Sequence, residues 1–236
     1  KLLEHIELGN SCVGTPSEPK VEQRFPYRDL PEGVEVAFGM NYPLILLKLR
    51  ATGDKSEQLL DEAELLLMKA MGEHIVGRDK ETLAGQVGKL LANNGLTLSL
   101  AESCTGGLIT QMLTSQPGAS AFLERAAVTY ADSAKLAWLN IEADLLQQHG
   151  AVSEECAREM VRGIRKAADT DLALAVTGVA GPAGGTIDKP VGTVFLALAA
   201  EDVEQVQKYH FNGDRNQVQL MTAHMGLEWL RRYIIG

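Results

Sequence analysis

The sequence predicts an α/β protein in which a three-layer α/β/α sandwich domain follows a small α+β domain. Three observations predict this fold class. Short strands that are apolar at every position alternate with amphipathic helices from Thr82 onward, which is typical of a sheet covered by helices on both faces. Two β-rich runs and one helix precede them. The length of 236 residues exceeds one average domain of roughly 100–200 residues. We therefore expect a small domain over residues 1–78 and a larger one over residues 79–236.

The small domain is predicted to begin with an irregular segment and to continue as a hairpin. Residues 1–33 show weak periodicity and contain four prolines, so we interpret them as a linker-like lead-in. Val34 to Phe38 and Leu44 to Leu49 are apolar, β-rich runs, and residues 39–43 between them carry the glycine and proline of a hairpin loop. These runs predict two paired strands.

One helix is predicted after the hairpin. Apolar side chains recur at intervals of three and four residues from Leu59 to Met71, with Ser56 as a candidate N-cap and Glu57 in the first turn. This pattern predicts an amphipathic helix laid on the hairpin, which gives a β-β-α module over about residues 30–78. Because no charged or nucleophilic cluster appears in the module, we expect it to have a structural or assembly role.

The larger domain alternates helices with strands. Its helices are predicted over residues 82–91, 106–113, 153–168 and 215–233. Its strands are predicted over residues 96–100, 126–130, 172–176 and 191–199, with an edge strand over residues 206–211. Ser153 is a candidate N-cap, since Glu154 and Glu155 follow it in the first turn. Ligands of open α/β sheets bind at the carboxyl ends of strands, so the loops at that edge are the candidate functional segments.

Composition and charge exclude several classes of function. Hydrophobic residues make up 45% of the chain, which excludes disorder, and the net charge of −9 is spread over both halves. A chain without a basic field does not suit nucleic-acid binding. The apolar stretches are far shorter than the ~20 residues that span a bilayer, and the first ten residues lack a signal-peptide pattern. We therefore expect a cytoplasmic protein with no nucleic-acid or membrane partner. We also expect a homo-oligomer, with a dimer favoured.

Cysteine and histidine spacing argues against a metal site. Cys12, Cys104 and Cys156 are widely spaced and form no CxxC, so neither a disulfide framework nor a Cys-rich zinc site is expected. The five histidines form no HExxH and no pair four residues apart. We expect free thiols, no metal and no cofactor.

The first candidate loop, residues 101–107, follows the strand over residues 96–100 and leads into a helix. Ser103 would stand near the positive end of that helix, among backbone N–H groups able to hold an anion or a tetrahedral oxyanion. The alternative is that Ser103 or Thr105 merely caps the helix.

The second candidate loop, residues 129–135, joins a strand to a helix for which Ser133 is a plausible N-cap. Lys135 lies in the first turn, where the helix dipole disfavours a cation and so favours the neutral amine that a base requires. Asp132 nearby acts in the opposite direction. The alternative is an ordinary solvated surface lysine.

The third candidate loop, residues 177–185, leaves a buried strand and contains four glycines in nine residues. Glycine lets the backbone approach a ligand closely, although a purely structural turn explains the loop equally well. Farther on, Arg215 opens the last helix, where it could bind a phosphate.

Together these loops resemble the carboxy-terminal domain of the CinA family, known as the NMN (nicotinamide mononucleotide) deamidase or nicotinamide-nucleotide amidohydrolase. The resemblance covers about residues 80–236 and is carried, in order, by LAESCTGG, VTYADSAK, HGAVSEE, AVTGVAGPAGG, GTVFLALA and GDR. The β-β-α module resembles the small middle domain of full-length CinA proteins. The family's large amino-terminal domain, similar to molybdopterin-binding proteins, would then be missing or reduced to residues 1–30. Because the chain begins at Lys1, we expect processing or a cut from something longer.

The resemblance implies a bacterial serine amidase of pyridine nucleotide recycling. Ser103 matches the nucleophile of the family, and Tyr130 and Lys135 match the pair that activates it. The substrate-binding residues implied are Thr105, Gly106, Thr177, Gly178 and Arg215, the last of them near the nucleotide phosphate. Many relatives carry Asn where this chain has Asp132, and the added carboxylate would slow a step in which Lys135 acts as a base.

The implied reaction is hydrolysis of the carboxamide of NMN to nicotinate mononucleotide and ammonia. A carboxamide resists hydrolysis, so the site needs an activated nucleophile, a proton donor for the departing ammonia and an oxyanion hole, and Ser–Lys pairs are one known solution. No metal or cofactor enters this scheme. The alternative is a catalytically silent nucleotide-binding or adaptor protein of the competence-damage-inducible, CinA-like type. Ser103, Tyr130 and Lys135 together favour the enzyme, since a binding module has no use for a nucleophile beside a lysine.

Overall fold

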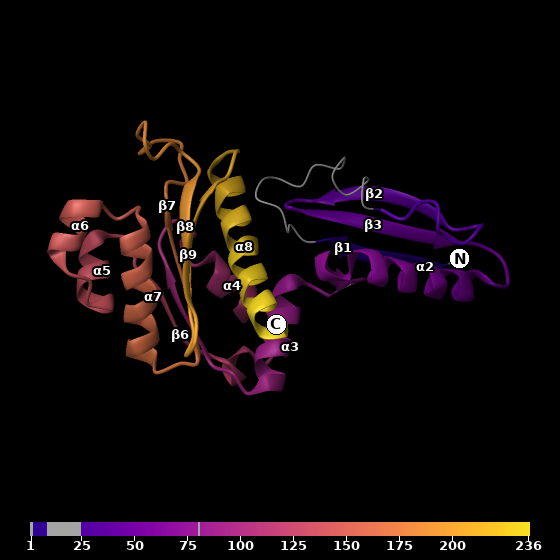
Figure 1. Ribbon diagram of the computed structural model, residues 1–236, viewed down its shortest axis with the longest axis horizontal. Coiled ribbons are helices and arrows are strands. Elements are labelled where there is room, and N and C mark those ends of the chain that lie inside the picture. The colour runs from indigo at the N-terminus through magenta and orange to yellow at the C-terminus, as the bar shows by residue number, and fades with distance from the viewer. Residues whose placement is uncertain (1, 9–24, 80) are drawn as a thin grey trace. The chain divides into compact units, whose positions relative to one another are not determined.

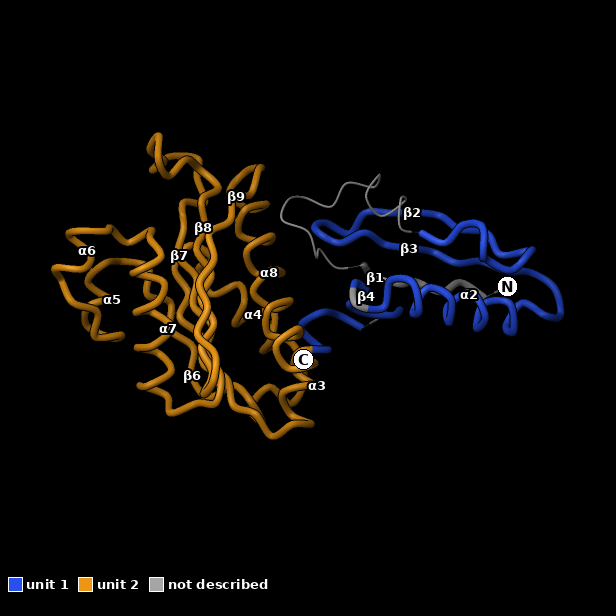
Figure 2. Tube along the Cα trace, viewed as in Figure 1, with its two compact units in different colours: residues 1–86 blue, residues 87–236 orange. Residues whose placement is uncertain are grey.

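The structure is a computed structural model that describes residues 2–8, 25–79 and 81–236. The chain divides into two compact units, Lys1–Gln86 and Val87–Gly236 (Figure 2). Cys12 lies outside the described residues. In the part of the chain that is described, no helix is both long enough and apolar enough to cross a membrane.

The first unit is built on a four-stranded antiparallel sheet with the order β2-β3-β1-β4. The strands are β1 (Leu2–Leu8), β2 (Glu35–Asn41), β3 (Leu44–Ala51) and β4 (Ile75–Arg78), and the helix α2 (Ser56–Met71) lies between β3 and β4 in the chain. Leu60, Ala63 and Leu67 of α2 form one buried cluster with Leu47 and Leu49 of β3. The predicted hairpin and amphipathic helix are therefore present, and the helix buries its apolar face against the sheet.

The interpretation of residues 1–33 as an irregular lead-in is wrong at its start, because Leu2–Leu8 form β1. This strand pairs with β3 from Leu2 opposite Ala51 to Leu8 opposite Ile45. The hydrogen bonds that fix β1 come from residues about forty positions away, which a local pattern does not contain. The expected loop is also shorter, since β2 and β3 leave only Tyr42 and Pro43 between them.

Ser56 is not the N-cap of α2. It is the first helical residue, and Lys55 precedes it at the cap position without a capping side-chain hydrogen bond. The helix depends instead on the burial of its apolar face, which is how most helices of globular proteins are stabilised.

The second unit contains a five-stranded sheet with the order β6-β5-β7-β8-β9. The strands are β5 (Leu98–Glu102), β6 (Leu123–Val128), β7 (Leu172–Gly178), β8 (Thr193–Ala199) and β9 (Glu204–His210). β5 pairs in parallel with both β6 and β7, whereas β8 and β9 are antiparallel additions at the other side. The carboxyl ends of three parallel strands thus meet at one edge of the sheet.

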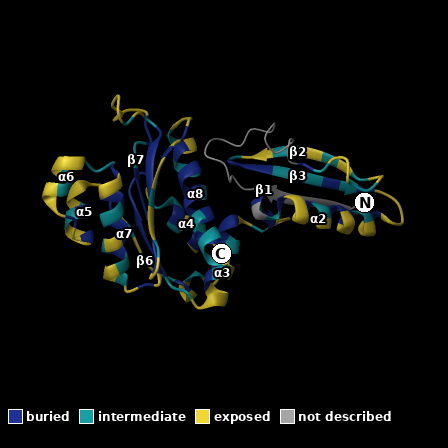
Figure 3. Cartoon of the chain, viewed as in Figure 1, coloured by how far each residue is buried: buried dark blue, intermediate teal, exposed yellow. Residues whose placement is uncertain are grey.

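Helices cover both faces of this sheet (Figure 1). One face carries α5 (Asp132–Leu139), α6 (Ala143–His149) and α7 (Glu154–Ala168), and the other carries α4 (Leu108–Thr114) and α8 (Arg215–Ile235). The helix α3 (Leu83–Asn94) precedes β5. Buried residues concentrate along the strands, while α6 is largely exposed (Figure 3). The predicted α/β fold is confirmed.

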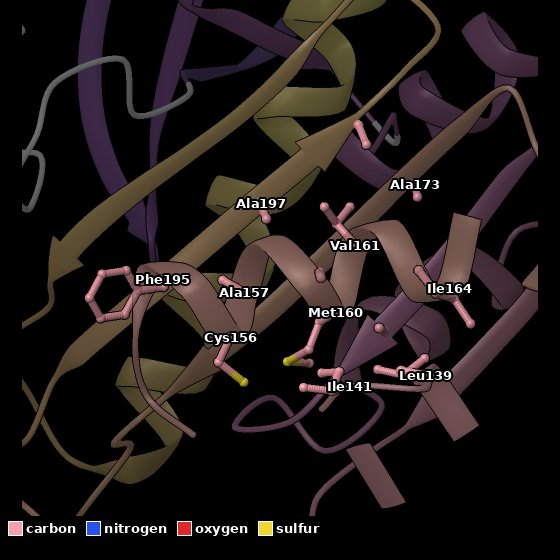
Figure 4. Close-up of a cluster of buried hydrophobic side chains, with 13 residues drawn as sticks. Leu139, Ile141, Cys156, Ala157, Met160, Val161, Ile164, Ala173, Phe195 and Ala197 are labelled. Carbon is pink, nitrogen blue, oxygen red and sulfur yellow. The ribbon is translucent and has the colours of Figure 1, made fainter. Parts of the chain in front are cut away.

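The two faces of the sheet differ in side-chain size because leucine and alanine alternate along β5, β7 and β8. The alanines face α7, where Met160, Val161 and Ile164 complete a buried cluster (Figure 4). The opposite face carries the leucines, and a Cβ added to Gly226 of α8 would lie 2.9 Å from the side chain of Leu174. Small residues on one face and a glycine on the opposing helix let both helix layers approach closely.

In the second unit, local sequence patterns predicted the start of α7 correctly but not the bounds of β6 or the presence of α6 (Ala143–His149). Ser153 caps α7 by accepting a hydrogen bond from the amide of Cys156, as predicted. The strand expected over residues 126–130 lies at Leu123–Val128, because β5 pairs with it in that register. The helix α6 was not expected, since it is short and its two leucines are only half-buried.

Gly163 fixes the distance between α5 and α7. A Cβ added at this position would overlap the carbonyl oxygen of Leu139, at the end of α5. Alanine normally improves a helix interior by about 1 kcal/mol over glycine, but overlap with a backbone atom typically costs about 1–3 kcal/mol. Because the backbone overlap is severe, we expect the cost to exceed the gain and the Gly163→Ala substitution to lower the free energy of unfolding by up to about 2 kcal/mol, as measured by urea denaturation.

The matched control for this prediction is Gly72→Ala, because Gly72 has helical backbone angles and an added Cβ would meet only the mobile end of Met68 at 3.8 Å. That variant should be as stable as the parent or slightly more stable. Equal stability of Gly163→Ala and the parent would show that α5 and α7 do not need this close approach.

Candidate active site

Ser103 stands at the carboxyl end of β5, where the parallel strands end. Its amide donates to the carbonyl of Val176 in β7 at 3.0 Å, and its own carbonyl accepts from the amide of Gly106 at 3.1 Å. These bonds extend the sheet by one residue and then turn the chain toward α4. The side chain is buried, although it lies in a loop.

Lys135 reaches Ser103 from the first turn of α5. Its side chain is 1% exposed, and its Nζ lies 3.3 Å from Ser103 Oγ. The same nitrogen lies 2.9 Å from the carbonyl oxygen of Thr129 and 3.2 Å from that of Tyr130. The carboxylate of Asp132, which is largely exposed, is 3.9 Å away. The reading of Lys135 as a solvated surface lysine is therefore wrong.

The path of the chain from β6 into α5 explains why Lys135 is buried. The amide of Thr129 still donates to Glu102 of β5 at 2.8 Å, after which the backbone leaves the sheet. Ala131 occupies the N-cap position of α5 without a side-chain hydrogen bond, so the expected capping role of Ser133 is wrong. The helix starts at Asp132, so Lys135 lies in its first turn, with Nζ 2.9 and 3.2 Å from the carbonyl oxygens of the two residues that follow β6.

Glu102 is a site residue that the sequence reasoning missed. Its carboxylate is 1% exposed and accepts from the amides of Gly107, Ile109 and Thr110 at 2.8–3.2 Å. The hydroxyl of Thr110 donates to it as well, at 2.6 Å. The positive end of α4 is thus already neutralised by a side chain of the protein itself.

This carboxylate corrects the expectation that Ser103 or Thr105 caps the helix, and it excludes three amides at the start of α4 as oxyanion donors. The amides at the start of α4 bind Glu102, so they are not free to hold an oxyanion or an external anion. Neither Ser103 nor Thr105 caps the helix, because the capping acceptor is the glutamate that precedes them. The glutamate beside Ser103 was the available signal, but it was not recognised as a cap because capping usually comes from a residue adjacent to the helix.

Cys104 lies beside Ser103 but is a poor nucleophile. Its side chain is 4% exposed, and burial raises the pKa of its thiol to about 12. The thiolate, which is the reactive form, is therefore scarce at neutral pH. The carbonyl of Cys104 accepts from Nε2 of Gln219 in α8 at 2.8 Å, a contact that the sequence did not suggest.

Thr105 and Gly106 complete the turn after Ser103. The hydroxyl of Thr105 is buried and has no hydrogen-bond partner among the described residues, and the same holds for the hydroxyl of Thr129. Gly106 adopts a positive φ of 64°, which a residue with a side chain rarely does. Unpartnered buried hydroxyls are costly in a protein, so these two are candidates for contact with a bound molecule.

Thr177 and Gly178 lie at the end of β7 and hold the third loop in place. The hydroxyl of Thr177 donates to the carbonyl of Ala151 at 2.7 Å. A Cβ added to Gly178 would lie 2.7 Å from the carbonyl oxygen of Thr193, so only glycine fits between the two strands. Both residues are therefore structural in this molecule, whatever further contacts they make with a ligand.

Arg215 connects the third loop with the second. It is the first residue of α8, whose N-cap Asp214 forms a capping box with Gln217. Its Nη1 donates to the carbonyl of Gly181 at 2.7 Å, and its Nη2 donates to the hydroxyl of Tyr130 at 3.1 Å. The hydroxyl of Tyr130 forms no described hydrogen bond with Ser103 or Lys135; the contact with Lys135 is made by the tyrosine carbonyl.

Two observations concern other parts of the described residues. No group of three or more His, Cys, Asp or Glu side chains in them could hold a metal ion. A cavity of about 450 Å³ lies near the amino end of β7, where Arg165, Thr170 and Ala199 line it, at the opposite edge of the sheet from Ser103.

Comparison with known proteins gives consistent matches. The family model for the CinA C-terminal domain matches residues 80–234. A CinA-like protein of Syntrophotalea carbinolica is 57% identical over 218 residues, which is 92% of this chain and 53% of that protein. A CinA-like protein of Geobacter metallireducens is 47% identical over 207 residues, 86% of this chain and 50% of that protein. The chain spans about half the length of these curated relatives.

Solved structures match as well. A CinA superfamily protein from Klebsiella pneumoniae has a TM-score of 0.63 and 36% identity, covering 65% of this chain and 96% of its own. A competence/damage inducible protein from Agrobacterium tumefaciens has a TM-score of 0.63 and 37% identity, covering 65% of this chain and 94% of its own. With the family model matched over residues 80–234, these similarities show that the chain belongs to the CinA family.

Proposed function

We propose that this chain is an amidase that hydrolyses the carboxamide of NMN to nicotinate mononucleotide and ammonia, with Ser103 as nucleophile and Lys135 as base. The observation that carries the proposal is the buried contact of 3.3 Å between Lys135 Nζ and Ser103 Oγ. The resemblance of the loops to the NMN deamidase domain supplies the substrate.

The hydrogen bonds of Lys135 suit a base. A neutral amine has two N–H groups and one lone pair. The carbonyls of Thr129 and Tyr130 can each accept one N–H group, which leaves the lone pair facing the hydroxyl of Ser103. The same arrangement holds the ammonium form after proton transfer, when the third N–H group points at the serine oxygen.

The proposed cycle conserves every proton. Lys135 takes the proton of Ser103, and the serine oxygen attacks the carboxamide carbon to form a tetrahedral intermediate. The ammonium of Lys135 returns the proton to the amide nitrogen, the carbon–nitrogen bond breaks and ammonia leaves a serine ester. Water, deprotonated by Lys135, then attacks the ester, and its proton returns to Ser103 as nicotinate mononucleotide leaves.

The oxyanion of the tetrahedral intermediate needs a donor other than the start of α4. Those amides bind Glu102, whereas the buried hydroxyl of Thr105 has no partner in the described protein. Thr105 is therefore the candidate donor for the oxyanion. A single donor of this kind is typically worth about 2.7–4 kcal/mol of transition-state stabilisation.

The buried lysine favours an enzyme over a catalytically silent nucleotide-binding protein. Burying a lysine amine is unfavourable, and the exposed carboxylate of Asp132, 3.9 Å from Lys135 Nζ, compensates for it only in part. A nucleotide-binding protein gains nothing from this arrangement, whereas a hydrolase requires a base beside its nucleophile.

The activity itself is the first test. We expect the purified protein to release ammonia from NMN in a coupled assay, with nicotinate mononucleotide as the second product. Activity should survive EDTA, because no step of the proposed cycle passes through a metal. Absence of ammonia from well-folded protein would favour the silent binding protein, and a loss that Zn²⁺ or Mg²⁺ reverses would contradict the Ser–Lys mechanism.

The choice of nucleophile is tested by Ser103→Ala and its neighbour variant Cys104→Ala. We expect Ser103→Ala to lower kcat on the order of 10⁴-fold or more, since it removes the attacking atom. Cys104→Ala should retain most of the activity, because the buried thiol is protonated. The reverse ranking, with both variants folded by circular dichroism, would assign the reaction to the cysteine.

The role of Lys135 is tested by Lys135→Met and Lys135→Arg. Methionine fills a similar volume without a base, and arginine keeps the charge but does not lose a proton near neutral pH. We expect both variants to lower kcat on the order of 10²–10⁴-fold with little change in KM. If Lys135→Arg keeps kcat and only KM responds in Lys135→Met, Lys135 is a phosphate ligand rather than a base.

A further inference from the structure

Tyr130 divides its contacts between two parts of the site. Its carbonyl oxygen lies 3.2 Å from Lys135 Nζ, beside the proposed nucleophile. Its hydroxyl lies 3.1 Å from Arg215 Nη2, and the residue is 58% exposed. The phenol group is thus turned away from the buried Ser103–Lys135 pair and toward the arginine.

Hydrogen-bond counting shows what this pair of side chains can bind. A guanidinium has five N–H groups, and Arg215 uses one for the carbonyl of Gly181 and one for the hydroxyl of Tyr130. Three N–H groups remain. The hydroxyl of Tyr130 accepts from Arg215, so its own O–H group remains available as a donor.

Arg215 also has no carboxylate partner among the described residues. Within the described ranges, no carboxylate forms an ion pair with it, whereas Arg158 and Arg162 of α7 both pair with Glu204. A half-buried guanidinium with free donors, next to a free phenolic O–H group, fits an anion with several acceptor oxygens. A phosphate monoester has this chemistry.

We propose that Tyr130 is a phosphate-binding residue that acts together with Arg215 and selects nucleotides over nucleosides, rather than a partner of Lys135 in proton transfer. The proposal rests on the proposed function, because it assigns the phosphate end of the same substrate. One residue then serves both ends of the site: its carbonyl orients the base, and its hydroxyl binds the phosphate.

The test compares Tyr130→Phe with the parent on NMN and on nicotinamide riboside, which lacks the phosphate. Phenylalanine keeps the ring and the backbone carbonyl, so only the hydroxyl is removed. We expect KM for NMN to rise about tenfold, the effect of one exposed hydrogen bond to a charged group. The kcat for NMN and both constants for the riboside should change by less than about twofold. Tyr233→Phe is the matched control, because its hydroxyl bonds Asp202 outside the site.

A second arm asks whether Tyr130 and Arg215 share one ligand. We expect Arg215→Ala also to raise KM for NMN and to spare the riboside. The double variant should raise KM by less than the product of the two single effects, because both residues bind the same phosphate. Inorganic phosphate should inhibit riboside hydrolysis by the parent more strongly than by Tyr130→Phe, which distinguishes a general phosphate site from one that needs the whole nucleotide.

Two kinetic outcomes would overturn the inference. A fall of kcat by on the order of 100-fold on both substrates in Tyr130→Phe would make the phenol a proton-transfer group. An unchanged KM for NMN would remove it from the phosphate site. If the parent does not hydrolyse NMN, the proposed function fails separately, and calorimetric dissociation constants for NMN and the riboside then give the same comparison. Equal binding of NMN by the parent and Tyr130→Phe would overturn the inference there.

Discussion

The burial of the Lys135 amine against three oxygen atoms is the interaction on which the site depends. A lysine side chain that is 1% exposed is tolerated only if its N–H groups are bonded, and here the carbonyls of residues 129 and 130 and the hydroxyl of Ser103 provide the acceptors. Those acceptors are in place because β6 ends beside β5 and the chain turns directly into α5.

Glu102 is a second buried polar side chain next to Ser103. A buried lysine and a buried glutamate flank the serine, and each has its own hydrogen-bond partners: carbonyls for the lysine, and amides with one hydroxyl for the glutamate. Neither depends on a bound ligand for its partners. The loop that carries Ser103 is therefore held between two satisfied polar centres, which keeps the side chain in position before a substrate arrives.

Local sequence patterns predicted the buried strands, the cap at Ser153 and the start of α8 at Arg215, because burial and capping leave periodicities and residue types within a few positions. They also identified Ser103 and Lys135 as candidate site residues. They failed where the deciding partner is far along the chain: β1 is fixed by β3, and the hydroxyl of Tyr130 meets an arginine 85 residues later. Glu102 was missed for a different reason, since it caps a helix that begins six residues after it.

The amino-terminal end of α8 joins two loops that leave different strands. Arg215 holds the carbonyl of Gly181 after β7, and Gln219, one turn later on the same face, holds the carbonyl of Cys104 after β5. The start of α8 is thus hydrogen-bonded to both loops and holds them together. Any movement that separates these loops has to displace the start of α8 or break these hydrogen bonds. The capping box that stabilises the start of α8 therefore also limits how far the loops can separate.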